Sequence, residues 1–366
     1  KILEPSVGVG NFIPLLFQKY EDKEEVILDV CGIDNNSLQI LSTILSIIKV
    51  PENFRINFVN ADFLLWDNNT KYDVVVGNPP FGKVSQNKEL LGLYRLQAFN
   101  SDTNNIFSFF IEKSLRLGGS VSLVVPKSLL SSPEFNKTRD LLQRSDLQKI
   151  CDYGEKAFKG VKIETISFLS SSSFSATDQI IVESYIKNTF EKASKSYIFS
   201  NKFPYWLIYR DENFDEVASK MKLNIFKSFR DRQITKSITE SKGKIRVLKS
   251  RNIGDNKVRR IDGYDCYVEK IDGLSVSKFY NNPNVVMVPN LTYYPRASFL
   301  PKNTITDGSV ALLTLKNGSR LPTEKDLSFY STQEFKDFYR VARNYGTRSL
   351  NIDNNSVFFF GLLKNV

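Results

Sequence analysis

The chain has 366 residues, of which 41% are hydrophobic, and a chain of this length is expected to form two domains with separate cores. It contains no histidine, which excludes Ser-His-Asp catalysis, Cys-His catalysis and histidine-ligated metals within these residues. Its three cysteines lie far apart, so we expect a reducing, cytoplasmic environment, no disulfides and no metal site. The most apolar stretch, residues 38–50, is too short to span a bilayer, so no membrane partner is expected.

The net charge of +10 is distributed unevenly along the chain. Residues 1–200 contain 22 Lys and Arg against 23 Asp and Glu, whereas residues 201–366 contain 28 against 17. A basic region that follows a neutral one suggests that the C-terminal part binds a polyanion while the N-terminal part does something else. The alternative is a basic surface that serves only solubility.

Strand and helix patterns alternate in the first half of the chain. Strands are predicted at residues 1–5, 26–34, 56–63, 72–81, 121–130, 149–154, 161–170 and 179–186. Helices are predicted at residues 10–20, 37–49 and 106–119. This order predicts an α/β fold in which a mostly parallel sheet is covered on both faces. Ligands of such sheets bind at the carboxyl ends of the strands.

The pattern changes after residue 187. Residues 188–204 are predicted to connect the first domain to a second one. Beyond them the sequence predicts short strands and few long helices, with many Asn, Tyr and Arg residues. We therefore expect a mixed α+β domain over residues 205–366.

A glycine motif, EPSVGVGNF, spans residues 4–12, where a strand ends and a helix begins. Gly8 and Gly10 form GxG, but Ile13 stands where the dinucleotide fingerprint has its third glycine, which weakens a pyrophosphate interpretation. Glu4 is placed to receive a positively charged group, such as the ammonium of an amino-acid moiety. Asp34 lies 24 residues after Gly10, close to the offset at which a carboxylate binds ribose hydroxyls.

Two further motifs follow later strands, NADF at residues 60–63 and NPPF at residues 78–81. Asp62 can accept a hydrogen bond from the exocyclic amine of adenine while Phe63 packs on the ring, although a helix N-cap is the alternative role for Asp62. The Asn78 side-chain oxygen and the Pro79 carbonyl can together accept both hydrogens of a planar amine. The prolines hold these acceptors stiffly, as electrostatic preorganisation requires, and Phe81 offers a face for stacking.

The motifs EPSVGVGNF, GID, NADF and NPPFG occur in an order that resembles the S-adenosylmethionine-dependent DNA methyltransferases that methylate adenine N6. The glycine motif precedes NPPF and a large C-terminal region follows, which is similar to the gamma class, typified by the Taq-type enzymes of restriction–modification systems. The resemblance covers roughly the first half of the chain. It implies a class I (Rossmann-like) methyltransferase fold for residues 1–187, with one late antiparallel strand.

The resemblance also implies roles for individual residues. Asn78, Pro79 and Phe81 would hold a flipped-out target adenine, with Phe158 stacking on its other face, although Phe158 is equally expected as a core residue. The residues that would bind the cofactor S-adenosylmethionine are Glu4, Ser6, Gly8, Asp34, Asp62 and Phe63. The cofactor-binding segment that precedes the glycine motif in this class is expected upstream of Lys1.

Two segments of the basic half are similar to target-recognition domains of restriction–modification specificity subunits. Residues 245–260 resemble the opening of such domains, and residues 345–352 resemble their closing segment. Arg and Lys can bind guanine edges or phosphates, and Asn can bind adenine edges. The candidate DNA-binding residues are Lys249, Arg251, Asn252, Arg259, Arg260, Tyr294, Arg296 and Arg348.

The sequence therefore predicts a methyltransferase that acts on adenine N6 in double-stranded DNA, with a cognate restriction endonuclease or a fused nuclease domain as a further expected partner. One alternative is methylation of RNA or of protein glutamine, against which the long basic half argues. Another is a DNA-binding specificity protein with an inactive methyltransferase fold. The intact Asn78, Asp62 and Asp34 argue against that alternative.

Overall fold

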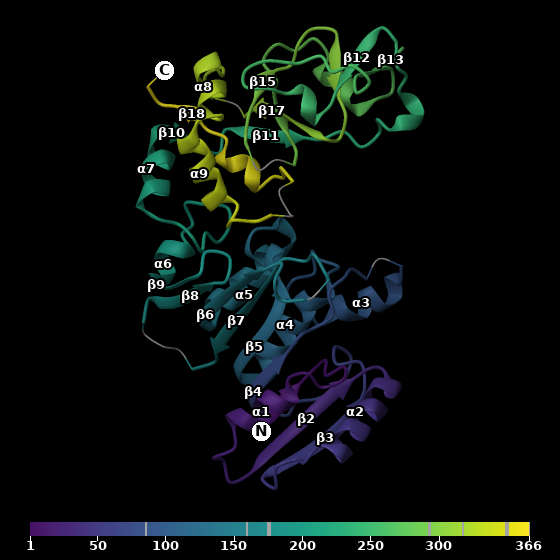
Figure 1. The fold of residues 1–366 in the computed structure, drawn as a ribbon, viewed down its shortest axis with the longest axis vertical. Helices are drawn as coiled ribbons and strands as arrows, with labels where there is room; N and C mark the ends of the chain where they lie inside the picture. Colours follow the sequence, from purple (N-terminus) through teal and green to yellow (C-terminus); the bar gives the residue numbers. More distant parts are fainter. Residues whose placement is uncertain are drawn as a thin grey trace. The chain divides into compact units, whose positions relative to one another are not determined.

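The computed structural model describes residues 1–84, 86–158, 160–173, 177–291, 294–316, 318–347 and 351–365 (Figure 1). The chain divides into two compact units, Lys1–Tyr197 and Ile198–Val366. No helix in the described ranges is long and apolar enough to cross a membrane.

The first unit is built around a nine-stranded sheet. Its strands are β1 (Ile2–Glu4), β2 (Val26–Gly32), β3 (Phe54–Asn60), β4 (Tyr72–Gly77), β5 (Gly118–Pro126), β6 (Asp146–Gly154), β7 (Thr165–Ser171), β8 (Gln179–Ser184) and β9 (Thr189–Ser194). Its helices are α1 (Ile13–Lys19), α2 (Asn35–Ile47), α3 (Lys88–Leu96), α4 (Ile106–Leu117), α5 (Asn136–Arg144) and α6 (Lys195–Ile198).

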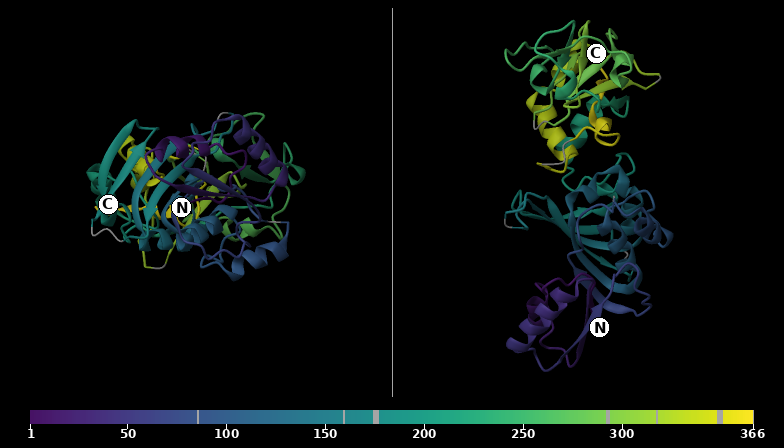
Figure 2. Two further views of the ribbon diagram at one scale, coloured as in Figure 1. Left: turned by 90° about the horizontal axis from the view of Figure 1, so that it is seen from below. Right: turned by 90° about the vertical axis from the view of Figure 1, so that its right-hand side faces the viewer.

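The strand order is β3-β2-β1-β4-β5-β7-β6-β8-β9, and the strands fan out with the twist typical of open sheets (Figure 2). Strands β1 to β5 pair in parallel, while β7 runs antiparallel between β5 and β6. This is the sheet of a class I methyltransferase, with one antiparallel strand late in the chain. The parallel part brings the ends of β1, β2, β3 and β4 to one edge, where ligands of such sheets bind.

Helices pack on both faces of this sheet. Side chains of α1 and α2 form a buried cluster with Val74 and Val76 of β4. Val75 lies between them in sequence and points to the opposite face, where α4 packs against β4 and β5. The sheet is therefore covered on both faces, as the alternating sequence pattern predicts.

The segment predicted to connect the domains is more ordered than expected. Residues 189–194 form β9, which pairs antiparallel with β8, and residues 195–198 form α6. Strand β9 lies at the edge of the sheet, and all of its residues are exposed or half-buried. Its sequence, TFEKAS, therefore lacks the apolar alternation by which a strand is predicted. The boundary between the two compact units falls after Tyr197, within residues 188–204.

The second unit contains three small sheets and three α-helices in the residues described. One sheet pairs β10 (Met221–Lys222) with β18 (Leu362–Leu363). A four-stranded sheet has the order β11 (Phe226–Phe229), β17 (Val310–Leu315), β14 (Val286–Pro289) and β15 (Ser298–Phe299). A three-stranded sheet has the order β13 (Cys266–Val268), β12 (Ile245–Leu248) and β16 (Thr304–Thr306). Its helices are α7 (Glu212–Lys220), α8 (Glu324–Phe329) and α9 (Gln333–Ala342). This is a mixed α+β unit.

Two cores hold the second unit together. The first is aliphatic and surrounds β12, β14 and β17. The second is aromatic: the ring of Phe214 on α7 stacks on that of Phe338 on α9 with centroids 4.6 Å apart, and Phe359 packs against both. The aromatic core explains why α7 and α9 lie side by side (Figure 1).

Candidate active site

The glycine motif and the NPPF motif meet at the ends of two neighbouring strands. Glu4 is the last residue of β1, and Asn78 follows the last residue of β4, which pairs in parallel with β1. The Ser6 hydroxyl donates a hydrogen bond to the Asn78 carbonyl at 3.0 Å. A Cβ at Gly77 would lie 3.3 Å from Cδ of Pro5, so a side chain there would crowd the turn. Residues 72 positions apart in the sequence are thereby held together.

The turn between β1 and α1 depends on glycine. Gly10 has a φ of +84°, and a Cβ at this position would lie 2.5 Å from Cδ1 of Leu41. A larger residue would therefore clash with α2 and strain the backbone. The turn ends where α1 begins at Ile13 with a proline in its first turn. The sequence prediction of a tight glycine turn between a strand and a helix is confirmed.

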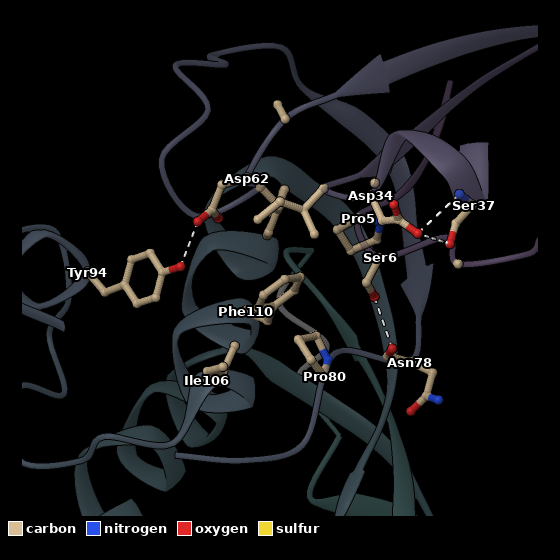
Figure 3. Close-up of a pocket in the computed structure, with 15 residues that line it drawn as sticks. Pro5, Ser6, Asp34, Ser37, Asp62, Asn78, Pro80, Tyr94, Ile106 and Phe110 are labelled. Carbon is tan, nitrogen blue, oxygen red and sulfur yellow. Dashed lines mark hydrogen bonds between the residues drawn. The ribbon is translucent and has the colours of Figure 1, made fainter. Parts of the chain in front are cut away.

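A cavity of about 430 Å³ opens at this edge of the sheet (Figure 3). Its size is within the range of small-molecule sites. It is lined by Pro5, Ser6, Gly8, Gly32, Ile33, Asp34, Ser37, Ala61, Asp62, Phe63, Asn78, Pro80, Tyr94, Ile106 and Phe110. The structure thus gathers residues from all four predicted motifs around one cavity.

Two oxygen atoms at the ends of β1 and β4 are buried without a hydrogen-bond partner, and of their two residues Asn78 lines the cavity whereas Glu4 does not. They are Oε2 of Glu4 and Oδ1 of Asn78. Glu4 is 1% exposed, and burial raises the pKa of its carboxyl group to about 8. Buried acceptors in native structures are nearly always paired, so each exception calls for an explanation. The two strand ends β1 and β4 each present one such acceptor.

Asp34 and Asp62 line the cavity, but protein groups already bind their carboxylates. Asp34 caps α2 by accepting hydrogen bonds from the backbone N–H groups of Asn36 and Ser37, each at 3.1 Å. These bonds and one from the Ser37 hydroxyl lower the pKa of Asp34. Asp62 accepts from the backbone N–H of Leu64 at 2.9 Å. Asp34 thus caps a helix, and Asp62 caps the turn at residues 63–65.

Tyr94 is a cavity residue that the sequence analysis missed. It lies on α3, and its hydroxyl donates to Oδ2 of Asp62 at 2.6 Å (Figure 3). Burial and the neighbouring Asp62 raise the pKa of Tyr94. The signal that could have revealed this helix is its amphipathic pattern after the capping residue Asn87. Tyr94 links the segment after NPPF to the Asp of NADF.

The aromatic residues differ in part from the expectations. Phe63 is 2% exposed and packs against Phe110 with ring centroids 5.0 Å apart, so it forms part of the cavity wall rather than an open stacking face. The rings of Phe81 and Phe158 do lie together, with centroids 6.0 Å apart and planes at 79°. A base between two parallel rings needs about 7 Å, twice the carbon–carbon contact distance. The two rings touch edge to face and leave no room for a base between them in this arrangement.

The basic candidates gather around the short 3₁₀ helix η4 (Ser250–Asn252) and the loop after it. Arg251, Arg259 and Arg260 are exposed, and Tyr294 is 67% exposed. The Lys249 ammonium lies 4.0 Å from the ring centre of Tyr264, and the Arg251 guanidinium lies 5.4 Å from it. The second unit therefore presents cations on one loop region, where a polyanion can reach them.

Two of the predicted DNA-binding residues, Asn252 and Arg296, form hydrogen bonds within the protein. Asn252 is 0% exposed, and its side chain bonds Asp265, the carbonyl of Arg259 and the backbone N–H of Lys249. Arg296 donates to the carbonyls of Ile253 and Ser250 at 2.6 and 3.1 Å, and burial lowers its pKa. Asn252 therefore holds the loop in shape and does not reach the surface, whereas the half-buried Arg296 holds the loop and keeps part of its side chain exposed. Arg348 lies outside the described residues.

No group of three or more potential metal ligands occurs within the described ranges.

Comparison with known proteins adds the family context. Residues 17–158 match the sequence model of the Eco57I restriction-modification methylases. The N-terminal unit is thus similar to restriction–modification methylases. The Type II methyltransferase M.TthHB8I of Thermus thermophilus is 34% identical over 120 residues, 30% of this chain and 28% of that protein. M.CvrRI of Paramecium bursaria Chlorella virus XZ-6E is 22% identical over 179 residues, 46% of this chain and 41% of that protein. The aligned regions thus span well under half of each relative.

Similarity to solved structures extends over almost the whole chain. The Type IIL restriction-modification enzyme MmeI, solved in complex with DNA, matches 98% of this chain and 61% of its own, with a TM-score of 0.63 and 11% identity. The type IIG restriction endonuclease BpuSI matches 99% of this chain and 55% of its own, with a TM-score of 0.50 and 13% identity. At these identities the matches support the fold, which is the class I methyltransferase fold in the first unit.

Proposed function

We propose that this chain is a DNA methyltransferase that transfers a methyl group from S-adenosylmethionine to N6 of an adenine that has left the duplex. The observation that carries the proposal is the pair of unpartnered, buried acceptors, Glu4 Oε2 and Asn78 Oδ1, at adjacent strand ends. One is a carboxylate suited to a cation and the other an amide oxygen suited to an amine. The relatives named above are restriction–modification methylases, which supports the same chemistry.

The residues around the cavity fit S-adenosylmethionine. Glu4 gains a partner if it meets the ammonium of the methionine moiety, and the glycine turn leaves space for a ligand because a Cβ at Gly8 would meet no atom within 4 Å. Asp34 lies beside Ser37 on the cavity wall, where its free acceptor capacity suits ribose hydroxyls. Asp62 keeps acceptor capacity for an adenine amine, and Phe63 and Phe110 provide an apolar wall. When bound, this cofactor supplies an electrophilic methyl group on sulfur.

The NPPF residues would activate the target amine. Asn78 Oδ1 and the Pro79 carbonyl each accept one hydrogen of N6, which builds up electron density on the nitrogen as it attacks. The Ser6 bond to the Asn78 carbonyl fixes the turn, and the prolines restrict its backbone, so the acceptors need little reorganisation. The Asn78 side chain points away from Asp34 and Asp62, which separates the amine position from the adenosine position (Figure 3). The chain needs no histidine and no metal ion for this step.

The target base would be held by Phe81 and Phe158. Their edge-to-face contact must open, or one ring must rotate, before a base can stack between them. Both rings are half-buried, so the base would replace a ring contact that it can make equally well. The exposed cations around η4 would contact DNA phosphates and bases.

The experiment is transfer of radiolabelled methyl groups from S-adenosylmethionine to duplex DNA, RNA and protein. We expect label on adenine of duplex DNA, and we expect Asn78→Ala to abolish it. Gln18→Ala is the matched control, because Gln18 is an exposed amide on α1 far in sequence from NPPF. Label only on RNA or protein would refute the DNA substrate, and undiminished labelling by Asn78→Ala would refute the role of Asn78.

A further inference from the structure

A buried lysine joins both ends of the loop that carries Phe158. Lys127 begins the 3₁₀ helix η1 (Lys127–Leu130), directly after β5. Its ammonium binds Oδ2 of Asp152 on β6 at 2.6 Å and lies 3.8 Å from Oε1 of Glu164, just before β7. Since β7 lies between β5 and β6, the lysine side chain reaches past one strand to the next.

The two carboxylates stand at the two ends of one connection. Asp152 precedes the loop between β6 and β7, and Glu164 is the last residue before β7. The backbone reinforces both ends: the Lys127 N–H donates to the Glu164 carbonyl at 2.9 Å, and the Gly154 N–H donates to Oδ1 of Asp152 at 3.0 Å. All three charged side chains are at most 7% exposed.

The loop leads from this charged cluster to the candidate active site. Phe158 lies on it, and the Phe158 ring contacts the ring of Phe81 in the NPPF segment. Buried charges lower stability unless each is paired, and apolar side chains of the same shape are often as good or better for stability alone. Stability alone therefore does not account for a lysine between two carboxylates at this place.

We propose that Lys127 is a positioning residue that sets the distance of Phe158 from NPPF by clamping both ends of the β6–β7 loop. The inference rests on the proposed function, because it assigns Phe158 to the target base. It acts on the base and leaves the cofactor cavity unaffected, since none of Lys127, Asp152 and Glu164 lines that cavity.

The test compares four variants of the whole chain. Lys127→Met removes the clamp, Lys127→Arg retains it, and Glu164→Gln releases only the end that precedes β7. Lys195→Met is the matched control: the Lys195 ammonium binds Asp146 at 2.5 Å, and Asp146 lies at the other end of the same strand β6. If Lys127→Met does not fold, the combination of Lys127→Met, Asp152→Asn and Glu164→Gln replaces it, because it removes all three charges together.

Amide hydrogen exchange gives a readout that does not depend on methylation. We expect Lys127→Met to accelerate exchange about tenfold or more at the hydrogen-bonded amides of the two loop ends, those of Lys127 and Gly154, with Glu164→Gln intermediate and Lys127→Arg near the original protein. Exchange in β1 and β4 should stay unchanged. Unchanged exchange at the amides of Lys127 and Gly154, or an equal acceleration of exchange there by Lys195→Met, would overturn the proposal.

Kinetics then separate the proposal from the proposed function. We expect Lys127→Met to lower kcat/KM for DNA by about 100-fold, while its affinity for S-adenosylmethionine stays within about twofold. If the original protein labels no DNA, the proposed function fails, whereas the exchange experiment still decides whether the clamp exists. A loss of cofactor affinity equal to the loss of DNA methylation would refute the positioning role.

Discussion

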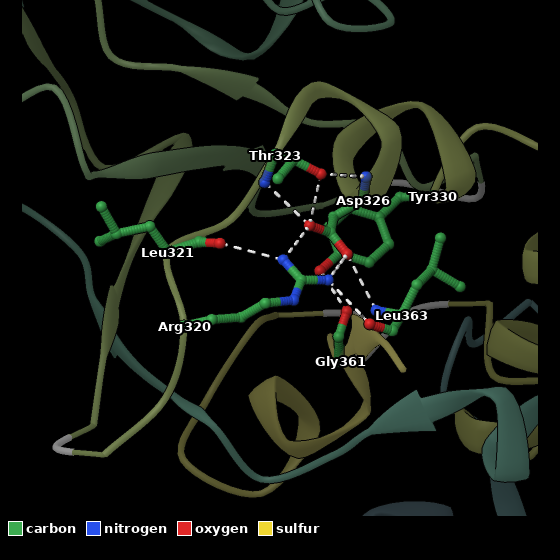
Figure 4. Close-up of polar contacts among 7 residues, drawn as sticks. All are labelled: Arg320, Leu321, Thr323, Asp326, Tyr330, Gly361 and Leu363. Carbon is green, nitrogen blue, oxygen red and sulfur yellow. Dashed lines mark hydrogen bonds and ion pairs between the residues drawn. The ribbon is translucent and has the colours of Figure 1, made fainter. Parts of the chain in front are cut away.

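Two buried carboxylates, Asp326 in the second unit and Glu4 in the first, have opposite environments. Asp326 in the second unit is 0% exposed and accepts hydrogen bonds from Arg320, Thr323 and Leu363 (Figure 4). Glu4 in the first unit is 1% exposed and has an oxygen without a partner. The hydrogen bonds of Asp326 fasten the fold, whereas we propose that Glu4 receives a cation that the chain does not provide.

The pKa shifts of the two groups follow from this difference. Burial alone would raise the pKa of Asp326, but the hydrogen bonds from Arg320, Thr323 and Leu363 outweigh it, and the pKa is lowered. At Glu4 nothing opposes burial, so the pKa rises to about 8. Two equally buried carboxylates therefore differ in pKa because only Asp326 has hydrogen-bond partners for both of its oxygens.

The largest expected loss of stability follows from removing Arg320, the partner of the buried Asp326. Arg320 donates two hydrogen bonds of 2.7 Å to Asp326 and one to the carbonyl of Leu363, which ties α8 to the C-terminal segment (Figure 4). Arg320→Met should lower the free energy of unfolding of the second unit by about 3 kcal/mol, since it leaves a buried charge with fewer partners. Denaturation by urea, followed by intrinsic fluorescence, measures this loss.

The control for Arg320→Met is Lys220→Met. Lys220 binds Glu216 and Glu334, and all three side chains are at least 41% exposed. This variant should cost less than about 1 kcal/mol. Equal losses of unfolding free energy in the two variants would mean that the buried Arg320–Asp326 pair contributes no more to stability than an exposed ion pair.

The second prediction is that removing the Glu4 carboxylate stabilises the protein, whereas removing the partner of Asp326 destabilises it. Because the folded-state pKa of Glu4 lies near 8, above its ordinary 4.5, the folded protein holds a proton that the unfolded chain releases. Stability from this group is therefore complete below pH 4.5, is lost as the pH rises toward 8, and is constant above. Glu4→Gln should remove this decline and stabilise the ligand-free protein by about 1–3 kcal/mol at pH 8.5.

Urea denaturation at pH 5 and pH 8.5 checks the Glu4 prediction, with both proteins measured at each pH. A decline between these pH values that is equally steep in Glu4→Gln would show that another group causes it. A destabilising effect of Glu4→Gln at pH 8.5 would mean that Glu4 has an internal partner.

The third prediction concerns Asp62, a carboxylate that has hydrogen-bond partners within the protein and also lines the cavity. Asp62 is held by Tyr94 and the backbone of Leu64, and it also lines the cavity. Tyr94→Phe removes one hydrogen bond and frees the Asp62 side chain to rotate. We expect about a five- to tenfold weaker affinity for S-adenosylmethionine, the effect of one hydrogen bond. Calorimetric titration measures it, and an unchanged affinity would remove Tyr94 from the site.

The smallest expected effect is at the exposed charges of the second unit. Arg251→Ala should weaken DNA binding uniformly across sequences and reduce the slope of log affinity against log salt by about 1. Arg296→Ala should instead destabilise the loop around η4, because its guanidinium binds the carbonyls of Ile253 and Ser250. DNA titrations at several salt concentrations distinguish the two. A lost salt slope in Arg296→Ala without destabilisation would reverse the assignment.

Much of the first unit could be predicted from the sequence because its elements follow simple rules. Strands such as β2 and β4 are strongly apolar, and the functional motifs directly follow strand ends. The edge strand β9 escaped prediction because it has no buried apolar face. Helix α3, which carries Tyr94, was not predicted, although the capping residue Asn87 and the amphipathic pattern after it favour a helix there.

The second unit shows where sequence reasoning stops. Asn252 and Arg296 have the side chains of base-reading residues, yet both are used to shape a loop. Composition places them in a basic region, but only the fold decides whether a polar side chain faces inward or outward. Phe158 differs from both: the resemblance of its motif placed it opposite Phe81, and the two rings do lie in contact, although no short-range pattern specifies the loop that carries it.

The most direct test of the account assigns separate tasks to Glu4 and Asn78. For Glu4→Gln and Asn78→Ala, one would measure the affinity for S-adenosylmethionine by calorimetry at pH 7.5 and the rate of methyl transfer to DNA at saturating cofactor. We predict that Asn78→Ala lowers the rate by about 100- to 1,000-fold with cofactor affinity within about twofold. Glu4→Gln should weaken cofactor affinity by about tenfold or more, the effect of a lost charged partner. If both variants lost cofactor affinity alike, or if Asn78→Ala kept its rate, the two acceptors would not divide the site as proposed.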